Sequence, residues 1–139
     1  MRHPLDAILS CVLTSFKINE AMANYENLNT SAFFYNKVFS LFNIYKNSLK
    51  LHHHEIKYEN IIQNFDLEIN LLLKFLNLEN EESLKNFHIT AKNRERINTP
   101  SYHQVIKPIY NKSINRYKKF SDVENIRPIV NEWIKEFDY

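Results

Sequence analysis

The sequence contains no glycine among its 139 residues, whereas a chain of this length with average composition would carry about ten. Phosphate-binding loops, nucleophile elbows and dinucleotide-binding turns need glycine for a positive φ or for a close approach of the backbone to the ligand. None of these motifs can therefore be present. Asparagine also tolerates the left-handed conformation, so we expect some of the 19 asparagines to end helices in place of glycine.

Cysteine and long apolar runs are scarce as well. Cys11 is the single cysteine, so no disulfide can form within the chain and a reducing compartment is allowed. No apolar run reaches the length of about 18 residues that a membrane span requires, and Asp6 interrupts the first apolar stretch, unlike a signal peptide. The formal net charge of +2 is too small to indicate a nucleic-acid or membrane partner. We expect one small cytoplasmic domain.

Apolar residues recur with a helical period in several segments. The sequence predicts helices over residues 4–17, 30–48, 66–76, 79–87, 112–120 and 124–137. Thr30 or Asn29 is the expected cap of the second helix, and its inward side chains are expected to be Phe33, Phe34, Val38, Leu41, Phe42 and Tyr45. Residues 89–111 lack the pattern, so we expect mostly loop there.

The stretch LHHHEIKY at residues 51–58 alternates between two faces, which predicts a short strand. A lone strand is not stable in water, so we expect its sheet partners to come from residues that precede this chain. The expected fold class is therefore α/β. This chain would form a mostly helical part of that fold, with one or two short strands.

Three successive histidines lie in the same stretch. His52 and His54 have the i, i+2 spacing that a metal site on a strand requires, but Cys11 is the only thiol available as a further ligand. Histidines of the core or of the surface explain the pattern better, and we expect no metal.

The stretch RHPLDAILS at residues 2–10 has the features of an anion site. Pro4 suits the first turn of a helix, and Asp6 suits the positive end of the helix dipole. A helix N-terminus preceded by an arginine attracts phosphate. A capped surface helix with an unrelated Arg2 is the alternative.

Residues 94–119 combine many cations with hydroxyl and aromatic side chains. This combination suits a ligand with a phosphate and a base, or a single-stranded nucleic acid. A solvated basic loop is the alternative, although a loop of this length is usually functional or disordered.

Taken in order, these stretches resemble the C-terminal half of a sulfotransferase that uses 3′-phosphoadenosine 5′-phosphosulfate (PAPS). RHPLDAILS is similar to the 3′-phosphate motif of that family, and KYENII followed by LLLKFLNL is similar to its Tyr-Glu-Asp strand end and the next helix. INTPSYHQVIKPIYNKSINRYKKF resembles the segment that closes over the nucleotide, especially in bacterial and tyrosylprotein-type members, and WIKEFDY resembles the closing helix. The resemblance covers essentially the whole chain and implies the C-terminal part of a P-loop-like sulfotransferase fold.

The resemblance also implies roles for individual residues. Arg2 and Ser10 would hold the 3′-phosphate, and Tyr58 would approach the adenine. Ser101 would contact the phosphate end of the nucleotide. Arg116 would be the second basic clamp, and Lys107 is a weaker candidate from the same loop.

Two parts of such an enzyme are missing from this sequence. In the family the glycine-rich 5′-phosphosulfate loop and the catalytic base precede the 3′-phosphate motif, and no histidine of this chain occupies the position of the base. We therefore assign no catalytic residue. We expect residues 1–139 to be a single partial domain that begins in mid-protein and is inactive alone. The whole enzyme would transfer a sulfuryl group from PAPS, without a metal, to an unidentified hydroxyl or amine acceptor.

A second hypothesis belongs to another class of function. The chain could be a non-enzymatic, helical binding module whose basic C-terminal segment docks an acidic partner or RNA. Binding of a 3′,5′-bisphosphorylated adenosine but not of AMP would favour the sulfotransferase hypothesis, whereas salt-sensitive binding of unrelated polyanions would favour the binding module.

Overall fold

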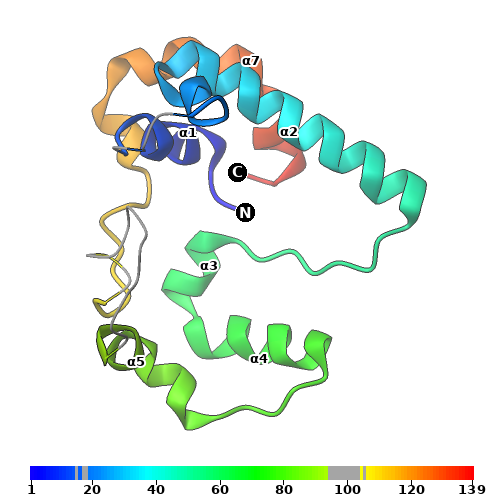
Figure 1. Cartoon of the computed structure of the whole chain (residues 1–139), viewed down its shortest axis with the longest axis vertical. Coiled ribbons are helices and arrows are strands. Elements are labelled where there is room, and N and C mark those ends of the chain that lie inside the picture. The colour runs from blue at the N-terminus through cyan, green and yellow to red at the C-terminus, as the bar shows by residue number, and fades with distance from the viewer. Residues whose placement is uncertain (15, 17–18, 94–103, 105) are drawn as a thin grey trace. The chain divides into compact units, whose positions relative to one another are not determined.

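The computed structural model describes residues 1–14, 16, 19–93, 104 and 106–139. These residues form two compact units (Figure 1). Unit 1 consists of Met1–Glu55 together with Lys112–Tyr139, and unit 2 consists of Ile56–Asn111. The first and last segments of the sequence therefore fold together, and the intervening segment forms a unit of its own.

Unit 1 combines helices from both ends of the chain. Helix α1 packs against α2 and α7, and α2 packs against α7. Its elements, in which η denotes a 3-10 helix, are α1 (Pro4–Val12), η1 (Met22–Tyr25), α2 (Leu28–Leu49), η3 (Arg116–Lys119), η4 (Ser121–Ile126) and α7 (Arg127–Glu136).

The core of unit 1 lies among α1, α2, η4 and α7. The indole Nε1 of Trp133 donates a hydrogen bond to Asn36 Oδ1 at 2.8 Å, which satisfies a polar group of a buried ring and joins α7 to α2. The buried apolar residues of this core are Leu5, Ile8, Leu9, Ala32, Tyr117, Val123, Ile126, Val130, Trp133, Ile134 and Phe137.

Polar side chains and left-handed residues set the helix ends. The side chain of Asn27, not Thr30 or Asn29 as expected, caps α2 by accepting a hydrogen bond from the amide of Thr30 at 3.0 Å. Helix α2 ends at Leu49, and the following residue, Lys50, has a φ of 47°. An asparagine does end α4 in the left-handed conformation, as expected, because Asn77 has a φ of 55°.

Unit 2 contains α3 (Tyr58–Gln63), α4 (Phe65–Leu76), η2 (Glu82–Asn86) and α5 (Phe87–Asn93). Helix α3 packs against α4, and η2 packs against α5. Among the side chains described in this unit, only Ala91 and Glu68 are buried. Unit 2 therefore lacks the closely packed apolar core that unit 1 has.

The predicted α/β fold class is wrong for the part of the chain that the structure describes, because helices are its only regular elements beside turns. Residues 51–57, where we expected a strand, are irregular, and Tyr58 is the first residue of α3 rather than the end of a strand. The physical reason is that a strand needs a hydrogen-bonded neighbour, and no described segment supplies one.

Four of the six predicted helices are present as α-helices with shifted ends, and the one expected at 112–120 is reduced to η3. The first ends at Val12 instead of residue 17, and the expected helix at 79–87 is replaced by η2 and α5. Helix α7 begins at Arg127, with Pro128 in its first turn. No helix within the described ranges is long and apolar enough to cross a membrane.

Candidate functional site

The opening motif at residues 2–10 forms a capped helix start. His3 Nδ1 accepts a hydrogen bond from the amide of Leu5 at 3.2 Å, and Pro4 occupies the first turn. Arg2 immediately precedes this cap, and its Nη2 donates a hydrogen bond to the carbonyl oxygen of Ser113 at 2.7 Å. The guanidinium is thereby held beside the segment that leads into η3.

A second contact joins the same two segments more firmly. The amide of Tyr117 donates a hydrogen bond to Asp6 Oδ1 at 2.7 Å, and the Asp6 side chain is almost completely buried. The ring of Tyr117 stacks on the ring of His3, with centroids 4.4 Å apart. Charged and hydrogen-bonded contacts of this kind are short-range and directional, so they fix η3 against the N-terminal end of α1.

Three of the six predicted site residues lie in α1, in η3 or directly before α1. Arg2 is half-buried before α1, Ser10 is half-buried in the second turn of α1, and Arg116 is the exposed first residue of η3. Lys118 and Arg127 each lie 5.9 Å from the centroid of the Tyr117 ring. Unit 1 thus gathers several cations around the junction of α1 and η3.

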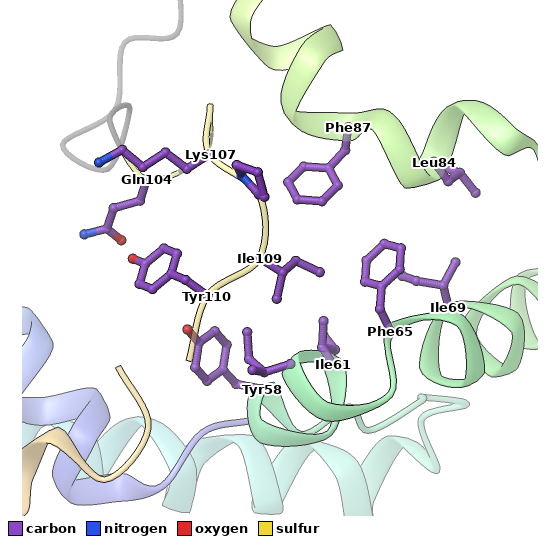
Figure 2. Close-up of a pocket in the computed structure, with 12 residues that line it drawn as sticks. Tyr58, Ile61, Phe65, Ile69, Leu84, Phe87, Gln104, Lys107, Ile109 and Tyr110 are labelled. Carbon is purple, nitrogen blue, oxygen red and sulfur yellow. The ribbon is translucent and has the colours of Figure 1, made fainter. Parts of the chain in front are cut away.

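Two further predicted residues lie together in unit 2. Tyr58 and Lys107 both line a cavity of about 510 Å³ between α3, α4, η2, α5 and the segment that ends at Tyr110 (Figure 2). Its walls are mainly aliphatic and aromatic. Tyr58 was expected at the carboxyl end of a strand. It lies instead at the start of α3, on the wall of an apolar pocket.

Ser101, the sixth predicted residue, lies outside the described residues. The structure thus associates Arg2, Ser10 and Arg116 within unit 1, and it associates Tyr58 and Lys107 within unit 2.

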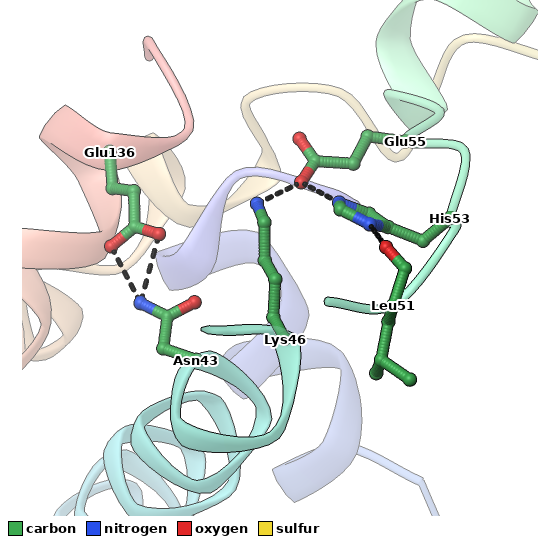
Figure 3. A network of polar contacts seen from close by, with 6 residues as sticks. All are labelled: Asn43, Lys46, Leu51, His53, Glu55 and Glu136. Carbon is green, nitrogen blue, oxygen red and sulfur yellow. Dashed lines mark hydrogen bonds and ion pairs between the residues drawn. The ribbon is translucent and has the colours of Figure 1, made fainter. Parts of the chain in front are cut away.

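The histidine stretch takes part in a polar network on unit 1 (Figure 3). His53 Nε2 lies 3.1 Å from Glu55 Oε1, His53 Nδ1 lies 2.9 Å from the carbonyl oxygen of Leu51, and Lys46 Nζ lies 2.8 Å from the same Glu55 oxygen. The hydrogen bond from Lys46 lowers the pKa of Glu55 below its ordinary value, and His53 adds to this effect. Asn43 on α2 donates to both carboxylate oxygens of Glu136 on α7, at 3.0 and 3.2 Å.

This network differs from a metal centre. Both ring nitrogens of His53 face oxygen acceptors, whereas a ligating nitrogen presents its lone pair to the metal. Within the described ranges, no group of three or more histidine, cysteine, aspartate or glutamate side chains is arranged to hold a metal ion.

Sequence reasoning missed the structural roles of Asp6 and His3. Asp6 was interpreted only as a complement to the helix dipole, and His3 was given no role. Their common partner, Tyr117, lies more than 100 residues away in the sequence. No local periodicity signals such a pairing. The only available signal was that both segments belonged to the same resemblance.

Comparison of the chain with family models, with curated proteins and with solved structures yields no match in any of the three. The roles assigned to individual residues rest on the sequence resemblance and on the contacts described above.

Proposed function

We propose that unit 1 binds the 3′-phosphate of a 3′-phosphoadenosine nucleotide, as part of a sulfotransferase that uses PAPS as sulfuryl donor. The observation that carries the proposal is the tie between Arg2 and Ser113, together with the tie between Asp6 and Tyr117. These contacts join the motif that resembles the 3′-phosphate site to the basic segment that resembles the nucleotide clamp. The two were proposed from separate parts of the sequence, and unit 1 unites them.

The chemistry of the junction suits a phosphate. The guanidinium of Arg2 is positioned by a hydrogen bond from Nη2 to a backbone carbonyl, and a guanidinium can donate to more than one acceptor at once. Arg116 adds an exposed cation at the start of η3. Ser10 offers a hydroxyl donor on the same helix that Arg2 precedes. Arg2 and Ser10 would bind the 3′-phosphate, with Arg116 as the second clamp.

The proposal for the chain alone is limited to binding. In sulfuryl transfer the acceptor oxygen or nitrogen attacks sulfur, the bond from sulfur to the 5′-phosphate oxygen breaks, and a base takes the acceptor's proton. Neither a base nor a loop for the 5′-phosphosulfate is assigned among residues 1–139. We therefore expect no turnover of PAPS by the purified chain, and PAPS-dependent product formation would contradict this part of the proposal.

The test is a comparison of two nucleotides that differ in one phosphate. Unfolding in urea is followed by the fluorescence of Trp133, the single tryptophan, which lies in the core of unit 1. We expect 3′-phosphoadenosine 5′-phosphate to stabilise unit 1 by about 2.7 kcal/mol at a concentration of about 100 times its Kd. AMP at the same concentration should have little effect.

Two variants separate the proposed site from general charge effects. Arg2→Ala should abolish the stabilisation by the bisphosphate, whereas Lys135→Ala, which removes an exposed cation from α7, should leave it unchanged. Equal stabilisation by AMP would overturn the proposal. Salt-sensitive stabilisation by an unrelated polyanion, equal to that by the bisphosphate, would favour the binding module instead.

Cys11 provides a second readout that does not depend on unfolding. Burial raises the pKa of the Cys11 thiol, and the charge of Arg2 lowers it to a smaller extent. A phosphate bound at Arg2 would offset that charge, so the thiolate fraction would fall and alkylation by iodoacetamide near pH 8 would slow. Arg2→Ala should slow alkylation in the free protein and remove the further effect of the nucleotide.

A further inference from the structure

The pocket of unit 2 has two chemically different ends. Figure 2 shows Phe65, Phe87, Ile61 and Ile109 facing one another on one side of the pocket. The polar ends of four other lining residues gather on the opposite side, and these are Tyr58, Gln104, Lys107 and Tyr110. An apolar cavity with a few polar groups at one end is the usual form of a small-molecule site, and about 510 Å³ lies within the usual range of such sites.

In the described part of unit 2, the side chains at the apolar end are only partly covered. Ile61, Phe65 and Phe87 are only half-buried, although α3, α4 and α5 direct them toward the same space. Covering apolar surface of this kind contributes about 25 cal/mol for each Å² removed from water. A ligand with a flat apolar body would therefore gain most from the rings of Phe65 and Phe87.

The polar end selects the charge of the ligand. Lys107 is the only charged residue among the described residues that line the pocket. An anionic group placed there gains an opposite charge, with hydroxyl and amide groups of Tyr110 and Gln104 beside it. A cationic group would meet a like charge.

We infer that the pocket of unit 2 binds a small aromatic anion, with its ring system against the paired rings of Phe65 and Phe87, whose centroids lie 6.0 Å apart, and its carboxylate or sulfonate at Lys107. The resemblance assigned Tyr58 and Lys107 of this pocket to the nucleotide, but the proposal for unit 1 rests on Arg2, Ser10 and Arg116 and does not use them. The two proposals are therefore tested separately.

The test uses two dyes that share an apolar body and differ in charge. 1-Anilinonaphthalene-8-sulfonate carries one sulfonate, and N-phenyl-1-naphthylamine is its neutral counterpart. Both are titrated into the full-length chain, and the increase in their fluorescence gives the affinity. Lys107→Gln should weaken binding of the sulfonate by about three- to fivefold, which is the effect of losing one exposed ion pair, and should leave the neutral dye unaffected.

Matched variants exclude binding elsewhere. Lys112→Gln removes an exposed lysine that belongs to unit 1 and should change neither titration. Ile109→Trp replaces an aliphatic side chain of the pocket with a larger indole ring and should weaken the binding of both dyes. Leu41→Ser, which reduces the exposed apolar surface of α2, should weaken neither.

Three results would overturn the inference. The first is a sulfonate affinity that Lys107→Gln leaves unchanged, and the second is an equal loss for both dyes in Lys107→Gln. The third is displacement of the sulfonate dye by 3′-phosphoadenosine 5′-phosphate, because the pocket would then belong to the nucleotide. The Lys107 comparison remains informative if Ile109→Trp does not fold, since Lys107 is an exposed side chain.

Discussion

At the scale of single residues, Asp6 has the most consequential position in unit 1. Its carboxylate is almost completely buried and accepts the amide hydrogen of Tyr117. A buried charge that loses its partner costs more free energy than the pair contributes when it is intact. Asp6 therefore links the placement of η3, and with it the placement of Arg116, to the start of α1.

Replacing Asp6 by alanine should destabilise unit 1 by about 2–3 kcal/mol, because it removes a hydrogen bond to a charged group and leaves a buried amide unsatisfied. Urea unfolding followed by Trp133 fluorescence measures the change. Asp6→Asn keeps an acceptor oxygen at similar size and should cost less. Glu132→Ala, an exposed acidic residue of α7, serves as the control and should change stability by no more than about 0.5 kcal/mol. Equal stability of Asp6→Ala and the parent chain would refute the role of Asp6.

At the scale of elements, α2 shows the limit of reasoning from periodicity. Its aromatic and aliphatic residues occupy several faces, so the sequence pattern does not define which face is inward. Of the six expected inward residues, Phe34 is half-buried and the other five are exposed by 37–58%, namely Phe33, Val38, Leu41, Phe42 and Tyr45. The face that contacts the core instead carries Leu28, Ala32, Tyr35 and Phe39.

The apolar face of α1 was predicted better, because its spacing defines a single face. Leu5, Ile8 and Leu9 of α1 are buried as the spacing indicated. Tyr58 and Lys107 were proposed from the sequence as nucleotide contacts, but the cavity that they share was not predicted, because its walls come from separate helices and from the segment near Tyr110. Contacts between segments distant in sequence leave no periodic signal, so the site could be predicted only in parts.

The end of α2 offers a direct test of backbone strain. Lys50 adopts a φ of 47° in a conformation that costs a residue with a Cβ about 1 kcal/mol and glycine almost nothing. Lys50→Gly should therefore stabilise unit 1 by roughly 0.5–1 kcal/mol, measured by urea unfolding. Lys37→Gly removes another exposed lysine from the middle of the same helix and should destabilise it by about 1 kcal/mol. Similar losses in both variants would show that Lys50 is not left-handed in solution.

At the scale of the whole molecule, the two units differ in how much apolar surface they bury. Unit 1 has a core of eleven buried residues, whereas the buried side chains described in unit 2 are Ala91 and Glu68. Segments with few buried contacts open at a lower free energy than well-packed ones. The units should therefore differ in local stability even though they belong to one chain.

Hydrogen exchange of the full-length chain, read by mass spectrometry, should reveal this difference. We expect the amides of α3, α4 and α5 to exchange faster than those of α1 and α7. 1-Anilinonaphthalene-8-sulfonate should slow exchange in unit 2, and 3′-phosphoadenosine 5′-phosphate should slow exchange in unit 1. Uniform protection across both units would contradict the division described here.

Unit 2 lies in the sequence between the two segments of unit 1, and this order has a consequence for synthesis on the ribosome. The apolar faces of α1 and α2 are covered by α7, which is translated after the whole of unit 2. At about 5–20 residues per second, the 84 residues between Glu55 and Tyr139 take roughly 4–17 s to appear. During this interval the first 55 residues remain without their partner and are open to chaperones, while unit 2 can already fold from local contacts.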